Sequence, residues 1–168
     1  ARVLKGKKVF VLASPNLSNE ALFLLSRLVK KSGGVGAYRV EQGAVAALPG
    51  APDLALRADR AANATGAQLL GFTRHESLLD LLQPGDALVV ADQDLSPGDA
   101  SAVSRASVVV VVGTAMPANL PKADIILPIA NVAEAAVVEG VTVRGAATLT
   151  EVCRHLGGEI TLEPVSTD

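Results

Sequence analysis

The segment Ala123-Asp124-Ile125-Ile126-Leu127-Pro128-Ile129-Ala130-Asn131-Val132-Ala133-Glu134 is the part of the sequence on which the assignment of the fold depends. Its β-branched and aliphatic run has the length of a short buried strand. Pro128 stops the run, because proline cannot donate a hydrogen bond within a sheet. We therefore predict a strand that delivers Asn131 and Glu134 to one edge of a sheet.

Three further apolar runs of strand length precede this segment, at Lys8–Ala13, Ala87–Ala91 and Ser107–Val112. Runs without polar interruption are typical of strands that helices cover on both faces, as in parallel sheets. Segments with helical spacing lie between the runs. The sequence therefore predicts an α/β fold with a doubly wound, mostly parallel, Rossmann-like three-layer sheet. We expect a single α/β domain over residues 1–163, followed by a polar tail at 164–168.

The first strand-loop-helix unit has the clearest local signals. Ser14-Pro15-Asn16 predicts a turn after the first strand, and Ser18 is a suitable N-cap for the helix that follows. Gly33-Gly34 predicts the end of that helix. A second strand at Ala37–Val40 would complete a right-handed βαβ crossover.

The remaining elements are assigned from composition and spacing. Glu41–Arg57 contains glycine and proline without a steady period, so it is predicted to be irregular. The other expected elements are two short helical pieces within Ala58–Phe72, helices at Glu76–Leu82, Pro97–Arg105 and Thr148–Leu156, and an edge strand at Glu159–Leu162.

Composition and charge argue against several classes of function. The 168 residues hold 15 basic and 17 acidic side chains, and only Lys5, Lys7 and Lys8 cluster, so no nucleic acid partner is expected. No cysteine or histidine spacing suits a metal site. No apolar run is long enough to span a bilayer, so we expect no direct membrane insertion. The chain begins at Ala1, and we expect it to be a piece of a longer polypeptide.

The loops that could bind nucleotides or metals are better interpreted as turns and helix ends than as binding sites. Gly33-Gly34-Val35-Gly36 follows a helix and lacks the spacing of a dinucleotide loop, and no P-loop motif occurs. Asp92 and Asp94 follow a strand, at the edge where doubly wound proteins bind ligands. A magnesium or phosphoacceptor site would need acids after the first strand too, so we interpret the pair as a solvated turn.

The histidines and the cysteine also favour structural roles. His75 and His155 are isolated from each other and are expected at the surface or at helix ends. Cys153, the single cysteine, is expected to be a buried apolar thiol within a helix. We find no nucleophile–base pair in the sequence pattern.

Three short motifs occur in order along the chain: Ser18-Asn19-Glu20-Ala21, Ala62-Asn63-Ala64-Thr65-Gly66-Ala67, and Ala123–Pro128 followed by Glu134. They resemble, respectively, the "sNE" turn, the "aN..Ga" turn and the A-D-[IV]-[IV]-L-P segment of molybdopterin oxidoreductases. The resemblance covers about residues 8–145. It is to that family as it occurs in the large iron–sulfur subunit of bacterial NADH–quinone oxidoreductase (complex I).

The sequence also departs from the active members of that family. Val137–Gly145 stands where active members have a G-T-F-x-N-x-E-G-R type segment that shapes the pterin pocket. The region between the first crossover and the second motif is compressed, which removes room for a bulky pterin dinucleotide. The resemblance therefore implies the C-terminal, molybdopterin-oxidoreductase-like domain of the subunit, without its cofactor.

The resemblance implies a structural domain that is not itself catalytic. Its partners would be other domains of its own subunit and other subunits of the complex I peripheral arm, in the cytoplasm and attached to the inner face of the cell membrane through the complex. No cofactor is expected here, and the iron–sulfur clusters would lie upstream. Candidates for a vestigial pocket are Ser14, Asn16, Asn63, Thr114, Asp124 and Glu134.

Two alternatives stay open from the sequence. One is the cofactor-binding domain of an active molybdenum or tungsten oxidoreductase, such as a formate dehydrogenase. The other is a Rossmann-like module that binds a nucleotide.

Overall fold

The computed structural model describes residues 4–40, 43, 45, 47–55, 59, 61–77, 80–114, 117, 119–120, 124–137 and 142–165. Its strands are β1 (Val9–Ala13), β2 (Val35–Tyr38), β3 (Ala47–Leu48), β4 (Ala51–Ala55), β5 (Thr73–Arg74), β6 (Ala87–Ala91), β7 (Val108–Val112), β8 (Asp124–Pro128) and β9 (Thr142–Ala146). Its helices are α1 (Asn19–Ser32), α2 (Ala64–Leu69), α3 (Ala100–Val103), α4 (Val132–Ala135) and α5 (Leu149–Leu156), with 3₁₀ turns at Pro97–Asp99 and Ile129–Asn131.

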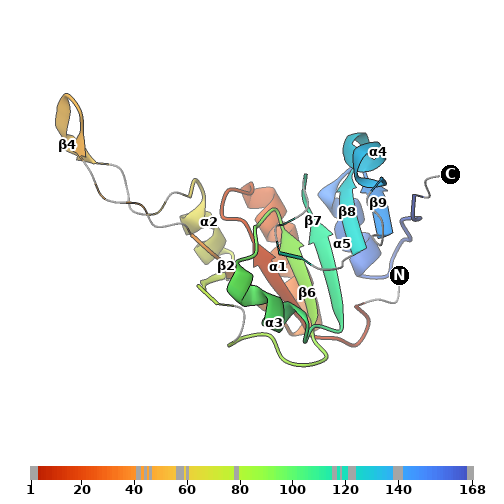
Figure 1. Cartoon of the computed structure of the whole chain (residues 1–168). Coiled ribbons are helices and arrows are strands. Elements are labelled where there is room, and N and C mark those ends of the chain that lie inside the picture. The colour runs from red at the N-terminus through yellow and green to blue at the C-terminus, as the bar shows by residue number, and fades with distance from the viewer. Residues whose placement is uncertain are drawn as a thin grey trace.

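Seven strands form one sheet in the order β5-β2-β1-β6-β7-β8-β9, and every neighbouring pair is parallel (Figure 1). The chain first moves outward from β1 to β2 and β5, then returns to place β6 on the other side of β1. This winding follows the order of doubly wound dinucleotide-binding folds, with one strand added at the end. The predicted fold class is confirmed.

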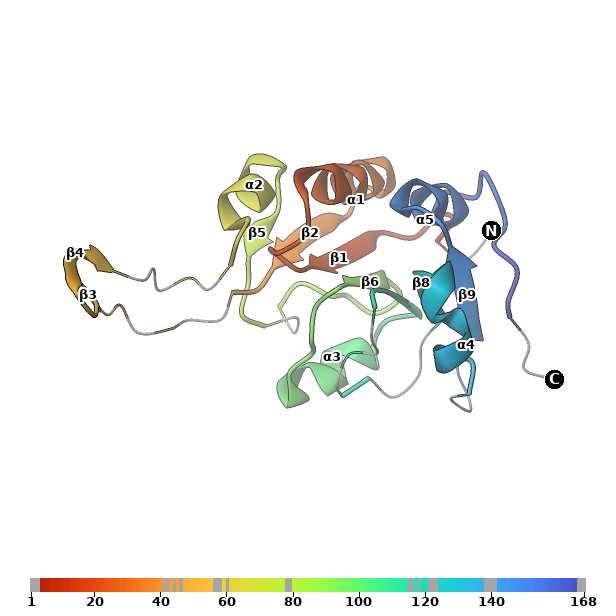
Figure 2. The same ribbon diagram turned by 90° about the horizontal axis from the view of Figure 1, so that it is seen from above.

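Side chains of the central strands enter two cores, because successive residues of a strand point to opposite faces. Val9, Val11 and Ala13 of β1 join the core that also contains α1 and α5 side chains. Phe10 and Leu12 join the core that contains α3 side chains. Figure 2 shows α1, α2 and α5 over one face of the sheet and α3 over the other. Burial on both faces thus explains the unbroken aliphatic runs.

Helix α1 begins and ends at the predicted residues. The Ser18 hydroxyl accepts a hydrogen bond from the Ala21 amide, which satisfies one of the free donors of the first turn. Gly33 ends the helix with φ 63°, a left-handed conformation that glycine adopts without steric cost. None of the helices in the described part of the chain, of which α1 with 14 residues is the longest, could cross a membrane.

The segment around β8 forms the predicted strand and edge. Ile125, Ile126 and Leu127 are buried, and Pro128 is the last residue of the strand. A 3₁₀ turn and α4 follow directly, and they carry Asn131 and Glu134 beyond the carboxyl end of β8.

Two predictions about the connections on the β2 side are wrong. The segment predicted to be irregular contains the antiparallel hairpin β3–β4, in which Gly50 adopts the positive φ that the turn requires. Figures 1 and 2 show this hairpin projecting away from the sheet. In the segment 58–72 the described residues form one helix, α2, rather than two helical pieces.

Two further predictions, for the later segments, are also wrong. Of the helix predicted at Glu76–Leu82, residues 76–77 and 80–82 are not helical, and Leu82 packs into the α3-side core; residues 78–79 lie outside the described residues. Residues 159–162 form no strand, and the strand at the edge beside β8 is β9, which the sequence analysis missed. The chain beyond α5 does run beside β9, where Pro164 forms an isolated bridge with Arg144.

Candidate functional site

The doubly wound sheet has a cleft where its winding reverses. Such sheets bind ligands outside the carboxyl ends of the strands on either side of the reversal, which here are β1 and β6. A cleft of about 670 Å³ lies at this place. It is lined by Ser14, Pro15 and Asn16 after β1, by residues 92–96 after β6, and by Arg39, Val40, Ala61 and Glu76. We call it the switch-point cleft. The predicted position of Asp92 and Asp94 at this edge is confirmed.

The switch-point cleft carries more acidic than basic side chains. Glu76, Asp92 and Asp94 line it, and Arg39 is the one basic residue among its described lining. The charge of Arg39 is already matched, because its Nη1 and Nη2 donate to the two carboxylate oxygens of Asp99 at 2.9 and 3.0 Å. A phosphate-bearing ligand would therefore meet net negative charge in this cleft.

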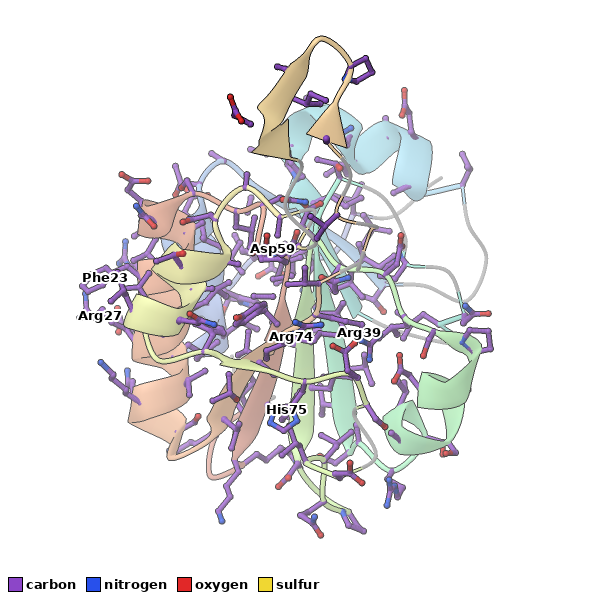
Figure 3. The ribbon with its side chains drawn as sticks, turned by 90° about the vertical axis from the view of Figure 1, so that its left-hand side faces the viewer. Phe23, Arg27, Arg39, Asp59, Arg74 and His75 are labelled. Atoms are coloured by element: carbon purple, nitrogen blue, oxygen red, sulfur yellow. The ribbon has the colours of Figure 1, made fainter. Side chains whose placement is uncertain are left out.

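The Arg39–Asp99 ion pair is almost completely shielded from water, with 15% and 2% of the two side chains exposed. Figure 3 shows Arg39 on the side of the molecule where α3 lies. Asp99 also accepts hydrogen bonds from the amide and hydroxyl of Ser96, both at 2.7 Å. Burial raises the pKa of Asp99, but the hydrogen bonds from Arg39 and Ser96 outweigh it and hold the pKa below its ordinary value.

Hydrogen bonds made by two asparagines, Asn16 and Asn63, connect the loop after β1 to the segment before α2. The Asn16 side-chain oxygen accepts from the Ala62 amide at 3.0 Å, and Asn63 Nδ2 donates to the Leu17 carbonyl at 2.9 Å. The Ser14 hydroxyl is engaged locally, accepting from the Asn16 amide at 3.3 Å. Three of the residues that the sequence suggests for a pocket, Ser14, Asn16 and Asn63, therefore make hydrogen bonds within the chain.

The first two family-like motifs meet in space. Asn63 Nδ2 donates to Asn19 Oδ1 at 2.9 Å, which joins the motif at residues 18–21 to the motif at 62–67. Gly66 lies against the same two side chains, and a Cβ at this position would overlap the Oδ1 atoms of Asn63 and Asn19. Packing thus explains why the second motif has asparagine at position 63 and glycine at position 66. We call the three residues the Asn19–Asn63–Gly66 contact.

Replacing Gly66 with alanine should destabilise the domain by about 1–2 kcal/mol, although alanine normally stabilises a helix relative to glycine by about 1 kcal/mol. Asn63→Ala should cost about 2 kcal/mol, because the Leu17 carbonyl loses its side-chain donor. The double variant should cost less than the sum of the two single variants, since Asn63→Ala removes the overlap with Asn63 Oδ1 and leaves only that with Asn19 Oδ1. Urea unfolding of the four proteins measures this coupling.

Thr65→Ala is the matched control, because Thr65 is an exposed residue of the same helix. It should change the free energy of unfolding by no more than about 0.5 kcal/mol. A Gly66→Ala protein that is more stable than the wild type would show that the contact does not constrain the helix.

The structure distributes the candidate pocket residues over four places. Ser14 and Asn16 line the switch-point cleft, and Asn63 binds the loop beside it. Thr114 is exposed after β7, and Glu134 is exposed on α4, beyond β8. Asp124 opens β8, so its backbone lies at the amino end of the strand rather than at the carboxyl edge. Thr114 and Glu134 are not among the described lining residues of the cleft.

The histidines and the cysteine take mostly structural positions. His155 is near the end of α5 as predicted, but it is buried and its Nδ1 accepts from the Leu162 amide at 3.1 Å. His75 is half-buried after β5. Cys153 is half-buried, and burial raises the pKa of its thiol to about 11. Among the described residues, no three His, Cys, Asp or Glu side chains gather in a way that could hold a metal ion.

Sequence reasoning missed the most buried charged pair of the site. Arg39 follows β2 and Asp99 opens the segment of α3, so 60 residues separate the partners. A signal was present, because Ser96-Pro97-Gly98-Asp99 has the spacing of a capping box, and the structure forms that box. No local sequence pattern around Arg39 indicated that it would pair with a buried carboxylate.

Comparisons of the chain with protein-family models, with curated proteins and with solved structures find no significant match in any of the three. The family resemblance therefore depends on the three motifs, and it stays a prediction.

Proposed function

We propose that this chain is a cofactor-less structural domain of the large iron–sulfur subunit of a bacterial NADH–quinone oxidoreductase. In this role it stabilises the cluster-bearing part of its subunit, while other domains carry electrons from NADH to quinone. Its partners are the other domains of that subunit and neighbouring subunits of the peripheral arm. It would lie on the cytoplasmic side, attached to the membrane only through the complex.

The Asn19–Asn63–Gly66 contact is the observation that carries this proposal. It joins two motifs of the family resemblance across 44 residues, and it does so with polar groups that bond each other. Because Asn63 Nδ2 and Asn19 Oδ1 are engaged with each other, these groups support a role in the fold rather than in holding a cofactor. The excess of acids in the switch-point cleft also opposes the pyrophosphate of a pterin dinucleotide.

The second candidate is a module that binds a small polar ligand, such as a nucleotide. Two observations favour it: the cleft lies where doubly wound folds bind ligands, and Arg39 Nε is buried without a hydrogen-bond partner in the described part of the chain. A ligand carbonyl could accept from this donor. The loop after β1 has Pro15 and Asn16 where dinucleotide-binding loops have glycines, which opposes a close approach of pyrophosphate.

An affinity tag on the chromosomal gene, followed by purification from mildly solubilised membranes, tests the first candidate. We expect the tagged polypeptide to be longer than this chain, to copurify with NADH–quinone oxidoreductase activity and iron, and to contain no molybdenum or tungsten. Metal analysis by mass spectrometry and pterin fluorescence are measured on the same sample. Stoichiometric molybdenum or tungsten with a pterin would instead identify the active oxidoreductase.

Thermal unfolding of the 168-residue chain with AMP, ATP and NADH tests the second candidate. The proposal expects no shift in the midpoint at millimolar nucleotide. A saturable shift that Arg39→Lys abolishes would contradict it and favour a nucleotide-binding module.

A further inference from the structure

A basic groove lies at the opposite end of the sheet from the switch-point cleft. Two adjoining cavities of about 670 and 520 Å³ form it, and they share Leu28, Lys31 and Gly157. Its walls are α1, α5 and residues 4–9, which lead into the amino end of β1. Figure 2 shows α1 and α5 side by side on one face of the sheet. We call this surface the α1–α5 groove.

Positive side chains surround this groove. Its described lining contains Lys5, Lys7, Lys8, Arg27, Lys31 and Arg154, against one acidic residue, Glu159. Figure 3 shows Arg27 on the outward face of α1. The chain as a whole has a formal net charge of −2, and the switch-point cleft has the opposite balance. The charges are therefore segregated between the two ends of the sheet, which creates a local positive potential at the groove.

The floor of the α1–α5 groove is apolar. Leu4, Leu28 and Leu156 line it with 5%, 7% and 7% of their surface exposed, so they are recessed behind the charged rim. Leu24 and Cys153 extend this floor into the second cavity and are half-buried. A recessed apolar floor with a charged rim fits a ligand that carries both apolar and charged side chains.

Glu159 shows how the rim holds a carboxylate. Its oxygens lie 3.5 Å from Lys31 Nζ and 3.5 Å from Arg154 Nε. More than half of each of these three side chains is exposed, so both ion pairs are weak and open to competition. A carboxylate from another chain could therefore replace Glu159 between the same two cations at little cost.

We propose that the α1–α5 groove binds an acidic amphipathic helix of a partner protein, whose carboxylates contact the basic rim while its apolar side chains cover Leu4, Leu28 and Leu156. Grooves of this kind receive helices through apolar residues at i, i+3, i+4 and i+7. The proposal does not depend on the respiratory assignment, since any partner with this chemistry fits. Nucleic acid would leave the apolar floor uncovered, and a bilayer needs projecting rather than recessed apolar side chains.

Fluorescence anisotropy with a synthetic 18-residue helix tests the proposal. The probe has leucine at i, i+3, i+4 and i+7 positions and glutamate elsewhere, and we expect saturable binding that weakens as salt rises. Lys31→Glu and Arg27→Glu should each weaken binding roughly tenfold, whereas Glu159→Gln should strengthen it about threefold. Arg105→Glu is the matched control, because it changes the net charge equally but lies outside the groove.

Cys153 supplies an independent readout, because it is the only cysteine in the chain and lies in the groove. Bound probe should slow its alkylation by iodoacetamide at least threefold.

Three results would overturn the proposal. One is equal affinity of the wild type and Lys31→Glu for the probe when circular dichroism shows both folded. Another is equal affinity for a polyglutamate peptide without leucine, which would make the apolar floor irrelevant. The third is tighter binding of duplex DNA, or of vesicles containing phosphatidylserine, than of the probe. None of these outcomes bears on the subunit assignment, which the copurification experiment decides separately.

Discussion

Gly34→Ala is expected to destabilise the domain by roughly 4 kcal/mol or more, or to prevent it from folding. Gly34 connects α1 to β2, where the chain passes directly against the backbone of β1. An added Cβ would overlap the carbonyl oxygen of Val9 and lie 2.7 Å from its carbonyl carbon. Because these atoms belong to the backbone of a central strand, no side-chain rotation can relieve the overlap. β1 pairs with both β2 and β6, so moving it would disturb the middle of the sheet.

Gly33→Ala is the matched control for this prediction. Gly33 adopts φ 63°, and a Cβ there would meet no atom within 4 Å. Its cost is therefore only the conformational strain of alanine in the left-handed region, about 1 kcal/mol. Circular dichroism during urea unfolding compares the two variants. A Gly34→Ala protein within 1 kcal/mol of the wild type would show that the connection at Gly34 lies farther from β1 than the structure has it.

Asp99→Asn is expected to lower the free energy of unfolding by about 3 kcal/mol, because it leaves the guanidinium of Arg39 buried without a counter-charge. The side chains keep nearly the same shape, so loss of packing contributes little. Glu76→Gln is the control, since it removes an ion pair with Arg74 in which 40% and 65% of the side chains are exposed. That change should cost less than about 1 kcal/mol. Equal effects of the two substitutions would contradict the burial of the Arg39–Asp99 pair.

The same pair predicts how stability depends on pH. The pKa of Asp99 is lower in the folded protein than in the unfolded chain, so the folded state is favoured while the carboxyl is ionised. This stabilisation is present above about pH 4, the ordinary range of an aspartate, and is lost as the pH falls through the lower folded pKa. Asp99→Asn should therefore flatten the loss of stability below pH 4. Urea midpoints measured from pH 2 to pH 7 for the two proteins check this difference.

The sequence predicted correctly those helices and strands whose ends or burial depend on their own residues. Ser18 and Gly33 bound α1 because a hydroxyl and an achiral residue satisfy the helix ends wherever the helix packs. The valine and leucine runs of β6 and β7 became strands because only burial on both faces accommodates them. The described residues of the predicted helix Glu76–Leu82 are not helical, and Leu82 packs into the α3-side core instead, which shows that tertiary packing can override helical spacing.

For the candidate site, too, the sequence predicted some features and the tertiary structure decided the others. The sequence by itself determined that Ser14, Asn16, Asp92 and Asp94 follow parallel strands, because strand ends can be read from local pattern. It also determined that two motifs carry Asn19, Asn63 and Gly66. Only the tertiary structure decided that these three residues contact each other, that Arg39 is matched by Asp99, and that six cations surround one groove. Each of these three arrangements depends on which strands become neighbours. Strand order is set by the packing of the whole sheet rather than by any one segment.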